Sequence, residues 1–193
     1  MRGWKAMNDA VNVKVAGFGG QGVMMFGQML AYSATEEEMY ALWVPSYGPE
    51  TRGGTANCSV IVSKKPINSP VFQKADRLVA FNLPSLQKFK DKVVPGGLVL
   101  YNSSLIKDEV AIEGVTVLAV PANDVALSLG NVQVANMVML GAFLEATGMF
   151  MDATVDHILQ KFLGERKAHL MPINRDAIAA GRGLAKGGAM PHA

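Results

Sequence analysis

Residues 17–22 read Gly-Phe-Gly-Gly-Gln-Gly; they follow the apolar run VNVKVA at 11–16 and lead into a helical pattern at 21–35. Glycine allows a tight turn and a close approach to the backbone, and the free N–H groups at a helix start attract anions. The stretch therefore predicts a strand, an anion-binding loop and a helix. We expect the strand at 12–18 to be central and parallel to its neighbours, because it leads into a helix.

The composition is that of a globular, core-forming chain. Its 193 residues are 50% apolar and 18% charged, and the mean hydropathy is +0.20. We expect a single α/β domain at 11–187, a flexible tail at 1–10 and a disordered tail at 188–193. The low charge indicates a surface partly buried against a partner protein; the alternative is an apolar α/β domain that is monomeric.

Charge and cysteine content exclude several functions. The 18 basic and 16 acidic residues are well mixed and leave a net charge of +2, so nucleic acid is not an expected partner. Cys58 is the single cysteine, so this chain alone forms no intramolecular disulfide, structural zinc site or iron–sulfur cluster. No secretory signal is evident and no apolar stretch reaches the roughly 18 residues of a membrane span, which predicts a cytoplasmic location and no membrane partner.

Hydrophobic periodicity places the other elements. We expect strands at 40–45, 56–63, 76–81, 98–101 and 115–121, and helices at 85–92, 125–129, 132–147, 154–163 and 174–186. Together they predict an α/β fold with three layers, in which a mostly parallel (mixed) sheet is flanked by helices and the C-terminal third is helical. The strand at 40–45 should close a right-handed βαβ unit.

Three local features carry further expectations. The sequence PGG at 95–97 should form a turn, and Asn123 or Asp124 should cap the helix that follows. The helix at 132–147 is apolar on nearly every face, so it should lie between the sheet and either the C-terminal helices or another subunit. This methionine-rich helical third is the candidate for subunit contact, with plain core as the alternative.

The glycine cluster satisfies the dinucleotide pattern G-x-G-x-x-G through Gly17, Gly19 and Gly22. That pattern also requires an acidic residue at the end of the second strand, but no carboxylate follows that strand before Glu50, which weakens the case for NAD. A P-loop is excluded because no Gly-Lys-Ser/Thr is present. As an alternative, the glycines only allow close packing of strand and helix.

A second polar loop, SYGPETRGGT at 46–55, is longer than most connections in such folds. In it, Arg52 precedes Gly53 and Gly54, and a guanidinium on such a loop can bind a carboxylate or phosphate through two hydrogen bonds. The alternative is an internal salt bridge from Arg52 to Glu50. Both glycine-rich loops should leave carboxyl ends of strands and therefore lie near one another.

Groups that would perform a reaction are missing near these loops. The three histidines, His157, His169 and His192, all lie in the helical last third or the tail. Cys58 sits in an apolar strand pattern that favours an inert buried thiol, and the run EEE at 36–38 favours a solvated acidic face over a metal site. These observations suit a subunit better than a complete enzyme.

Four motifs in this order resemble a known family: GFGGQG at 17–22, SYGPETRGGTANC at 46–58, AFNLPS at 80–85 and PGG at 95–97. They are similar to the gamma subunit of the 2-oxoacid:ferredoxin (acceptor) oxidoreductases, over about residues 11–185. The resemblance implies an α/β domain with a mixed sheet that belongs to a complex converting a 2-oxoacid to its acyl-CoA. Electrons in such complexes pass through iron–sulfur clusters to ferredoxin or another acceptor.

The resemblance also implies where the cofactors lie. Thiamine diphosphate, Mg and the Fe–S clusters would belong to partner subunits, namely alpha, beta and in some complexes a ferredoxin-like delta subunit, and CoA would enter as co-substrate near the gamma domain. By this analogy, the CoA side or the contact with the catalytic subunits would be lined by Gly19, Gly20, Gln21, Gly22, Tyr47, Glu50, Arg52, Gly53 and Gly54.

The loop at 46–58 is most similar to the 2-oxoglutarate branch of the family, although the pyruvate, branched-chain and indolepyruvate enzymes use similar gamma domains. A different class of function also fits the glycine cluster. That alternative is a free-standing Rossmann-like nucleotide-binding domain with a regulatory or scaffold role.

Overall fold

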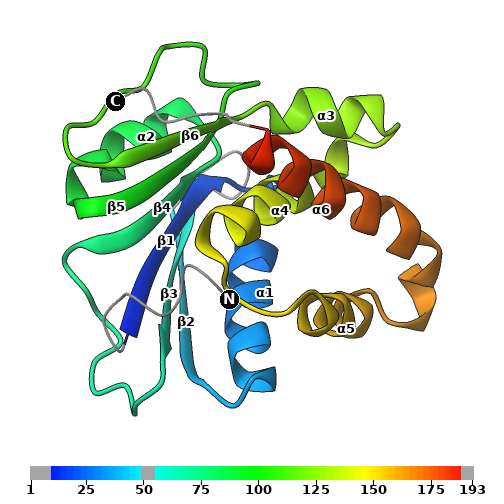
Figure 1. The fold of residues 1–193 in the computed structure, drawn as a ribbon, viewed down its shortest axis with the longest axis horizontal. Coiled ribbons are helices and arrows are strands. Elements are labelled where there is room, and N and C mark those ends of the chain that lie inside the picture. Colours follow the sequence, from blue (N-terminus) through cyan, green and yellow to red (C-terminus); the bar gives the residue numbers. More distant parts are fainter. Residues whose placement is uncertain (1–9, 49–54, 188–193) are drawn as a thin grey trace.

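The computed structural model describes residues 10–48 and 55–187, which form one six-stranded sheet in the order β2-β3-β1-β4-β5-β6 (Figure 1). Ala10, expected in the N-terminal tail, is the first residue of the sheet; residues 1–9 and 188–193 lie outside the description. The strands are β1 (Ala10–Phe18), β2 (Tyr40–Tyr47), β3 (Thr55–Ser63), β4 (Ala75–Ala80), β5 (Val93–Asn102) and β6 (Thr116–Val120).

The sheet is mixed, as the sequence predicts. β1, β4, β5 and β6 run parallel to one another, whereas β3 is antiparallel to both of its neighbours, β1 and β2. The expectation that β1 is parallel to its neighbours is therefore correct for β4 and wrong for β3. The cause is the β2–β3 hairpin, which folds β3 back between β2 and β1, so that β2 is parallel to β1 without pairing with it.

Helices cover both faces of the sheet and complete the three expected layers (Figure 1). Alternate residues of β1 and β3 pack against α1 and α4, and β4 and β5 pack against α2 on the opposite face. The helices are α1 (Val23–Glu36), α2 (Leu83–Phe89), α3 (Ala122–Ser128), α4 (Ala135–Thr147), α5 (Asp152–Leu163) and α6 (Met171–Lys186). Short 3-10 helices occupy 90–92, 132–134 and 165–170.

The helix α4 is core rather than surface. All of its 13 residues except Glu145 and Ala146 are buried, and it packs against α6 as well as the sheet. Gly141 of α4 and Gly181 of α6 bring the two backbones together, because a Cβ on either would overlap a carbonyl oxygen of the other helix. The expected position between the sheet and the C-terminal helices is confirmed, and α4 exposes little surface outside Glu145 and Ala146.

The expected turn at 95–97 is wrong. These residues belong to β5, where the pairing with β4 shifts from Ala75↔Val93 to Arg77↔Leu98. The extra residues form an irregularity in the strand, with Gly96 at φ 76° and its N–H donating to the Gly114 carbonyl at 2.6 Å. Proline and glycine mark bulges as well as turns, which is why the local pattern pointed to the wrong structure.

The expected cap of α3 is wrong, whereas the expected acidic surface at 36–38 is present. Neither Asn123 nor Asp124 caps α3, whose N-cap is Pro121; Asn123 Oδ1 instead accepts a hydrogen bond from Asn102 at 2.7 Å. The acidic run at 36–38 lies at the surface as expected, with Glu36 and Glu38 exposed, and two of its carboxylates also make contacts. Glu36 pairs with Lys161 and His157 of α5, and Glu37 accepts a hydrogen bond from the Met151 N–H at 2.6 Å, so these carboxylates fasten α5 to the end of α1.

Candidate functional site

The two glycine-rich loops leave the sheet at the same edge. β1 ends at Phe18 opposite Thr55, and β2 ends at Tyr47 opposite Ala56, so the carboxyl ends of β1 and β2 flank the start of β3. Two strand spacings separate these ends by about 10 Å. The expected proximity of the loops is confirmed for their described parts; the predicted site residues Glu50, Arg52, Gly53 and Gly54 lie outside the described residues.

The loop at 19–22 turns the chain from β1 into α1. The Gln21 N–H donates to the Phe18 carbonyl at 3.2 Å, and Gly20 (φ 92°) and Gly22 (φ 78°) have left-handed backbones that favour glycine. Gly22 is the N-cap of α1, and no side chain caps that end among the described residues. The N–H groups of the first helical turn are therefore free of a side-chain acceptor, as an anion site requires.

The four glycines of this motif fall into two pairs with different roles. A Cβ on Gly17 would press on Val23 and Phe81, and a Cβ on Gly22 would overlap the side chain of Asn136. Around Gly19 and Gly20 a Cβ would meet nothing within 4 Å, and both residues are exposed. Close packing thus explains Gly17 and Gly22, whereas Gly19 and Gly20 leave backbone open to a ligand or partner.

Gln21, a predicted site residue, has a positioning role. Its Oε1 accepts hydrogen bonds from the Phe18 N–H at 2.7 Å and from Asn82 Nδ2 at 3.0 Å. Asn82 follows β4, is 5% exposed, and accepts a hydrogen bond from the Ser85 N–H at 3.0 Å as the N-cap of α2. The two amides therefore join the glycine loop to the carboxyl end of the next parallel strand.

Two asparagines at this edge, Asn82 and Asn136, were not predicted as site residues. The sequence does carry a signal for Asn82, since Asn before Leu-Pro is a typical helix start. Asn136 opens α4, is 5% exposed and lies against Gly22. A polar residue at the start of an otherwise apolar helix is the signal that marks it.

Tyr47, the remaining predicted site residue within the described part, is 69% exposed at the end of β2. It stands at the same edge as Gly19 and Gly20, because β1 and β2 end there together. The phenol is thus available to a ligand or partner at this edge. Of the predicted site residues that the structure describes, Gly22 and Gln21 build the loop, and Gly19, Gly20 and Tyr47 are accessible.

The prediction that Cys58 is an inert buried thiol is confirmed. The residue is fully buried between the sheet and α1, and burial raises the pKa of its thiol to about 11. A thiol with such a pKa is almost entirely protonated at neutral pH, so it is neither a good nucleophile nor a good metal ligand. Within residues 10–48 and 55–187, no group of three or more His, Cys, Asp or Glu side chains could hold a metal.

The described part of the chain also contains no helix long and apolar enough to cross a membrane. Two of the three histidines are described, and both lie away from the glycine loop: His157 pairs with Glu36 at 3.4 Å, and His169 lies in the 3-10 helix before α6. The edge therefore offers backbone donors, a phenol and positioning amides. It is equipped to bind, and it contributes no acid, base or nucleophile from the described residues.

Fold and edge together define a class: an α/β domain with a mixed sheet and a ligand-binding or partner-binding glycine loop at the carboxyl ends of β1 and β2. Residues 12–184 match the family described as pyruvate ferredoxin/flavodoxin oxidoreductase. The chain belongs to this family, which bears out the resemblance drawn from the four motifs.

Among curated relatives, ketoisovalerate oxidoreductase subunit VorA of Methanothermobacter thermautotrophicus is 40% identical over 89% of this chain and 35% of its own length. The chain thus spans about a third of the VorA proteins that it matches. The 2-oxoglutarate synthase subunit KorC of Methanothermobacter marburgensis is 37% identical over 71% of this chain and 77% of its own length.

Solved structures show the same fold. The 2-oxoglutarate:ferredoxin oxidoreductase of Magnetococcus marinus, described with 2-oxoglutarate, coenzyme A and succinyl-CoA bound, superposes with a TM-score of 0.86 at 25% identity, covering 95% of this chain and 32% of that one. The gamma subunit of a keto/oxoacid ferredoxin oxidoreductase from Geobacter sulfurreducens gives a TM-score of 0.78 at 26% identity. That match covers 92% of this chain and 99% of that subunit.

Proposed function

We propose that this chain acts as the gamma subunit, or the equivalent domain, of a complex that oxidatively decarboxylates a 2-oxoacid to its acyl-CoA and passes the electrons to ferredoxin or another acceptor. Membership of the family carries this proposal, and relatives named as subunits of such enzymes support it. Thiamine diphosphate, Mg and the Fe–S clusters belong to alpha, beta and delta-type partner subunits, and the complex is cytoplasmic.

The edge of the sheet where β1 and β2 end, with Gly19, Gly20, Tyr47 and the start of α1, is called the glycine edge, and it supports a role on the CoA side of the complex. The open backbone at Gly19 and Gly20 and the uncapped start of α1 suit a phosphate group of CoA. Arg52, on the loop that leaves β2 at the same edge, supplies a guanidinium for the same phosphates. In this role, the chain binds and orients CoA, while the chemistry takes place on the partner subunits.

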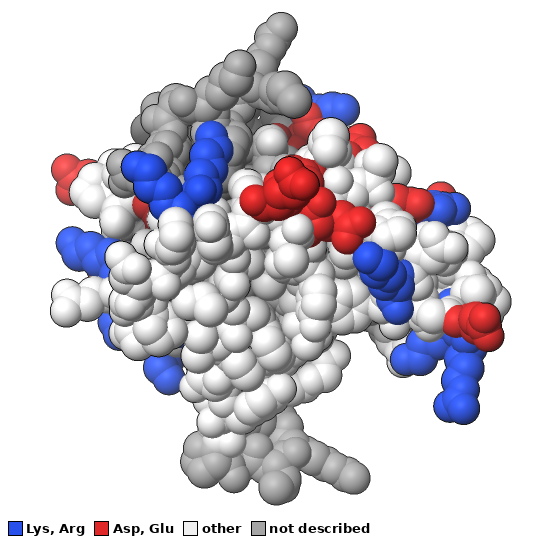
Figure 2. All heavy atoms as spheres, turned by 90° about the horizontal axis from the view of Figure 1, so that it is seen from below, with Lys and Arg blue, Asp and Glu red and all other residues white. Residues whose placement is uncertain are grey.

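Partner subunits also need a surface to contact, and β2 offers one. It is an edge strand without a charged side chain, and its Tyr40, Val44 and Tyr47 are 49%, 39% and 69% exposed. Figure 2 shows one side of the molecule. On this side, groups of Lys, Arg, Asp and Glu lie around a broad central area without charged side chains. Exposed apolar edge strands are usually protected by charge, so this edge is suited to lie against another chain.

The nature of the 2-oxoacid is part of the proposal. The loop at 46–58 favours 2-oxoglutarate, and relatives are named for 2-oxoglutarate, ketoisovalerate and pyruvate. We propose 2-oxoglutarate as the substrate of the complex. Reduction of methyl viologen by the purified complex with each 2-oxoacid in turn measures this preference.

Affinity purification of the tagged chain from its native cells tests the assignment to a complex. We expect a thiamine diphosphate-binding protein and an iron–sulfur protein to co-purify, together with CoA-dependent and 2-oxoacid-dependent viologen reduction. An unrelated protein with the same tag, purified in parallel, is the control for proteins that bind non-specifically to the tag or the resin. Recovery of a single monodisperse chain that binds NAD or another nucleotide in calorimetry would instead support the free-standing nucleotide-binding domain.

A further inference from the structure

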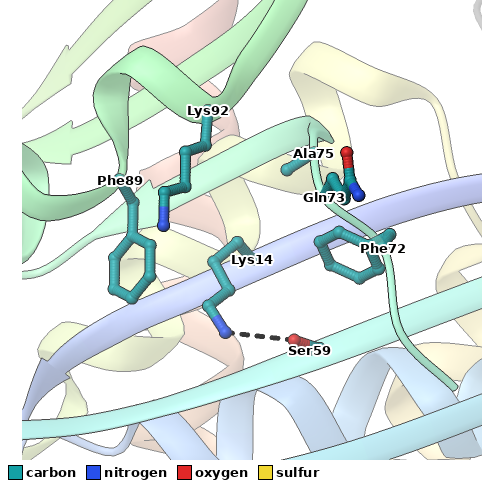
Figure 3. Close-up of a pocket in the computed structure, with 7 residues that line it drawn as sticks. All are labelled: Lys14, Ser59, Phe72, Gln73, Ala75, Phe89 and Lys92. Atoms are coloured by element: carbon teal, nitrogen blue, oxygen red, sulfur yellow. Dashed lines mark hydrogen bonds between the residues drawn. The ribbon is translucent and has the colours of Figure 1, made fainter.

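A pocket lies on the face of the sheet opposite α1, away from the glycine loop (Figure 3). It has a volume of about 350 Å³, and we name it the lysine pocket after two of its residues; it is lined by Lys14, Ser59, Phe72, Gln73, Ala75, Phe89 and Lys92. Such a volume falls within the range of small-molecule sites. Lys14 precedes the end of β1 by four residues, which places the pocket about 13 Å from the glycine loop.

Lys14 is an unusual residue for its position. It lies on a central strand between Val13 and Val15, which point into the core on the α1 side, so its own side chain points to the opposite face. Its ammonium group donates to Ser59 Oγ on β3 at 3.1 Å, and Figure 3 shows this bond in the lower part of the view. Half-buried ammonium groups commonly have an acidic partner, whereas among the described residues Lys14 hydrogen-bonds this hydroxyl and forms no ion pair with a carboxylate.

Other cations gather around the same point. The ammonium groups of Lys14, Lys88 and Lys92 lie 4.9, 5.4 and 5.9 Å from the centre of the Phe89 ring. None of the three forms an ion pair with a carboxylate of the described residues. The ring offsets some of the repulsion, because its face attracts cations, but it carries no negative charge.

The electrostatics of Lys14 reflect this crowding. Burial lowers the pKa of Lys14 below its ordinary value, Cys58 raises it, and Lys88 and Lys92 lower it further. The buried carboxylate of Asp76 on the next strand accepts the Asn12 N–H at 2.7 Å and is not among the groups that shift this pKa. An anion in the pocket would favour the charged form of Lys14.

From this arrangement we propose that the lysine pocket binds a small phosphate-bearing anion, such as a phosphate monoester or a diphosphate. Figure 3 shows Lys92 extending toward Phe89 and Lys14 extending toward Ser59, so an anion between them would meet ammonium groups that come from different elements. Ammonium groups act as point charges that suit a tetrahedral phosphate, and the described residues of the lining include no guanidinium fork of the kind that matches a planar carboxylate. Phe72 and Ala75 accommodate the apolar part of the ligand.

Calorimetric titration of the full chain with pyrophosphate at neutral pH and low salt tests this site. We expect wild type to bind pyrophosphate at least about tenfold more tightly than succinate, a dicarboxylate of modest size. Lys14→Met and Lys92→Met should each weaken pyrophosphate binding about tenfold, the effect of losing one charge-assisted hydrogen bond. Lys107→Met changes an exposed lysine outside the pocket and should bind as wild type does.

Both pocket variants should fold normally. Methionine keeps the apolar stem of lysine, and Lys14→Met removes a charge that burial disfavours, so its thermal midpoint should equal or exceed that of wild type. Wild-type affinity in a folded Lys14→Met or Lys92→Met variant would overturn the proposal. Equal affinity for succinate and pyrophosphate, or no binding of pyrophosphate by wild type, would overturn it as well.

Discussion

The Gly181→Ala variant is expected to lose about 3 kcal/mol of unfolding free energy, because its added methyl group overfills the contact between α4 and α6. A Cβ at Gly181 would overlap the Val138 carbonyl oxygen and crowd the Ala142 nitrogen, which are backbone atoms of a buried helix. Neither atom can move without displacing α4 from the core. Urea unfolding followed by circular dichroism measures the loss.

Gly183→Ala is the matched control in the same helix. Gly183 is exposed, and a Cβ there would meet nothing within 4 Å. Alanine is the better helix former, so this variant should be more stable than wild type by about 0.5 kcal/mol. Equal stability of the two variants would show that α4 and α6 do not approach as closely as described.

The Gly22→Ala variant is also expected to lose about 3 kcal/mol of unfolding free energy, and this loss has two separate causes. A left-handed backbone at φ 78° costs an L-residue about 1–2 kcal/mol, and the added methyl group would also overlap the side chain of Asn136. Because Gly22 is the N-cap of α1, the loss disturbs the start of that helix and the glycine loop. Thermal and urea unfolding measure the change.

Gly20→Ala separates these two causes. Gly20 has φ 92°, but a Cβ there would meet nothing within 4 Å, so only the conformational cost of about 1–2 kcal/mol applies. The double variant Gly22→Ala with Asn136→Ala should recover the part that comes from overlap, when it is compared with Asn136→Ala alone. If Gly20→Ala and Gly22→Ala lose the same free energy, packing against Asn136 contributes nothing.

Much of the fold could be predicted from local patterns. The apolar period of α4 and the glycine that ends it predicted a buried helix with a stop at Gly148, and the structure has both. The place of β3 could not be predicted in this way. A strand pattern shows which residues are apolar, but the same pattern fits parallel and antiparallel pairing, and only the hairpin after β2 reverses the direction.

In the candidate site, too, local features could be predicted from the sequence, whereas contacts between distant residues could not. The glycine motif predicted the turn into α1 and a backbone that a ligand or partner can approach closely, because those properties depend on neighbouring residues. The bond between Gln21 and Asn82 joins residues 61 positions apart, and the contact of Gly22 with Asn136 spans more than a hundred. Such partners become visible only when the fold brings them together.

If the glycine edge serves the CoA side of a 2-oxoacid oxidoreductase complex, as we propose, changes at this edge should alter the apparent KM for CoA. Gly19→Val fills the open approach to the loop without a backbone clash, and Arg52→Ala removes the proposed guanidinium contact. In the purified complex, each variant should raise the KM for CoA about tenfold. The KM for the 2-oxoacid should stay the same, and Gly183→Ala should leave both constants unchanged. Fully assembled complexes whose CoA kinetics equal those of wild type in both variants would contradict a role of the glycine edge on the CoA side.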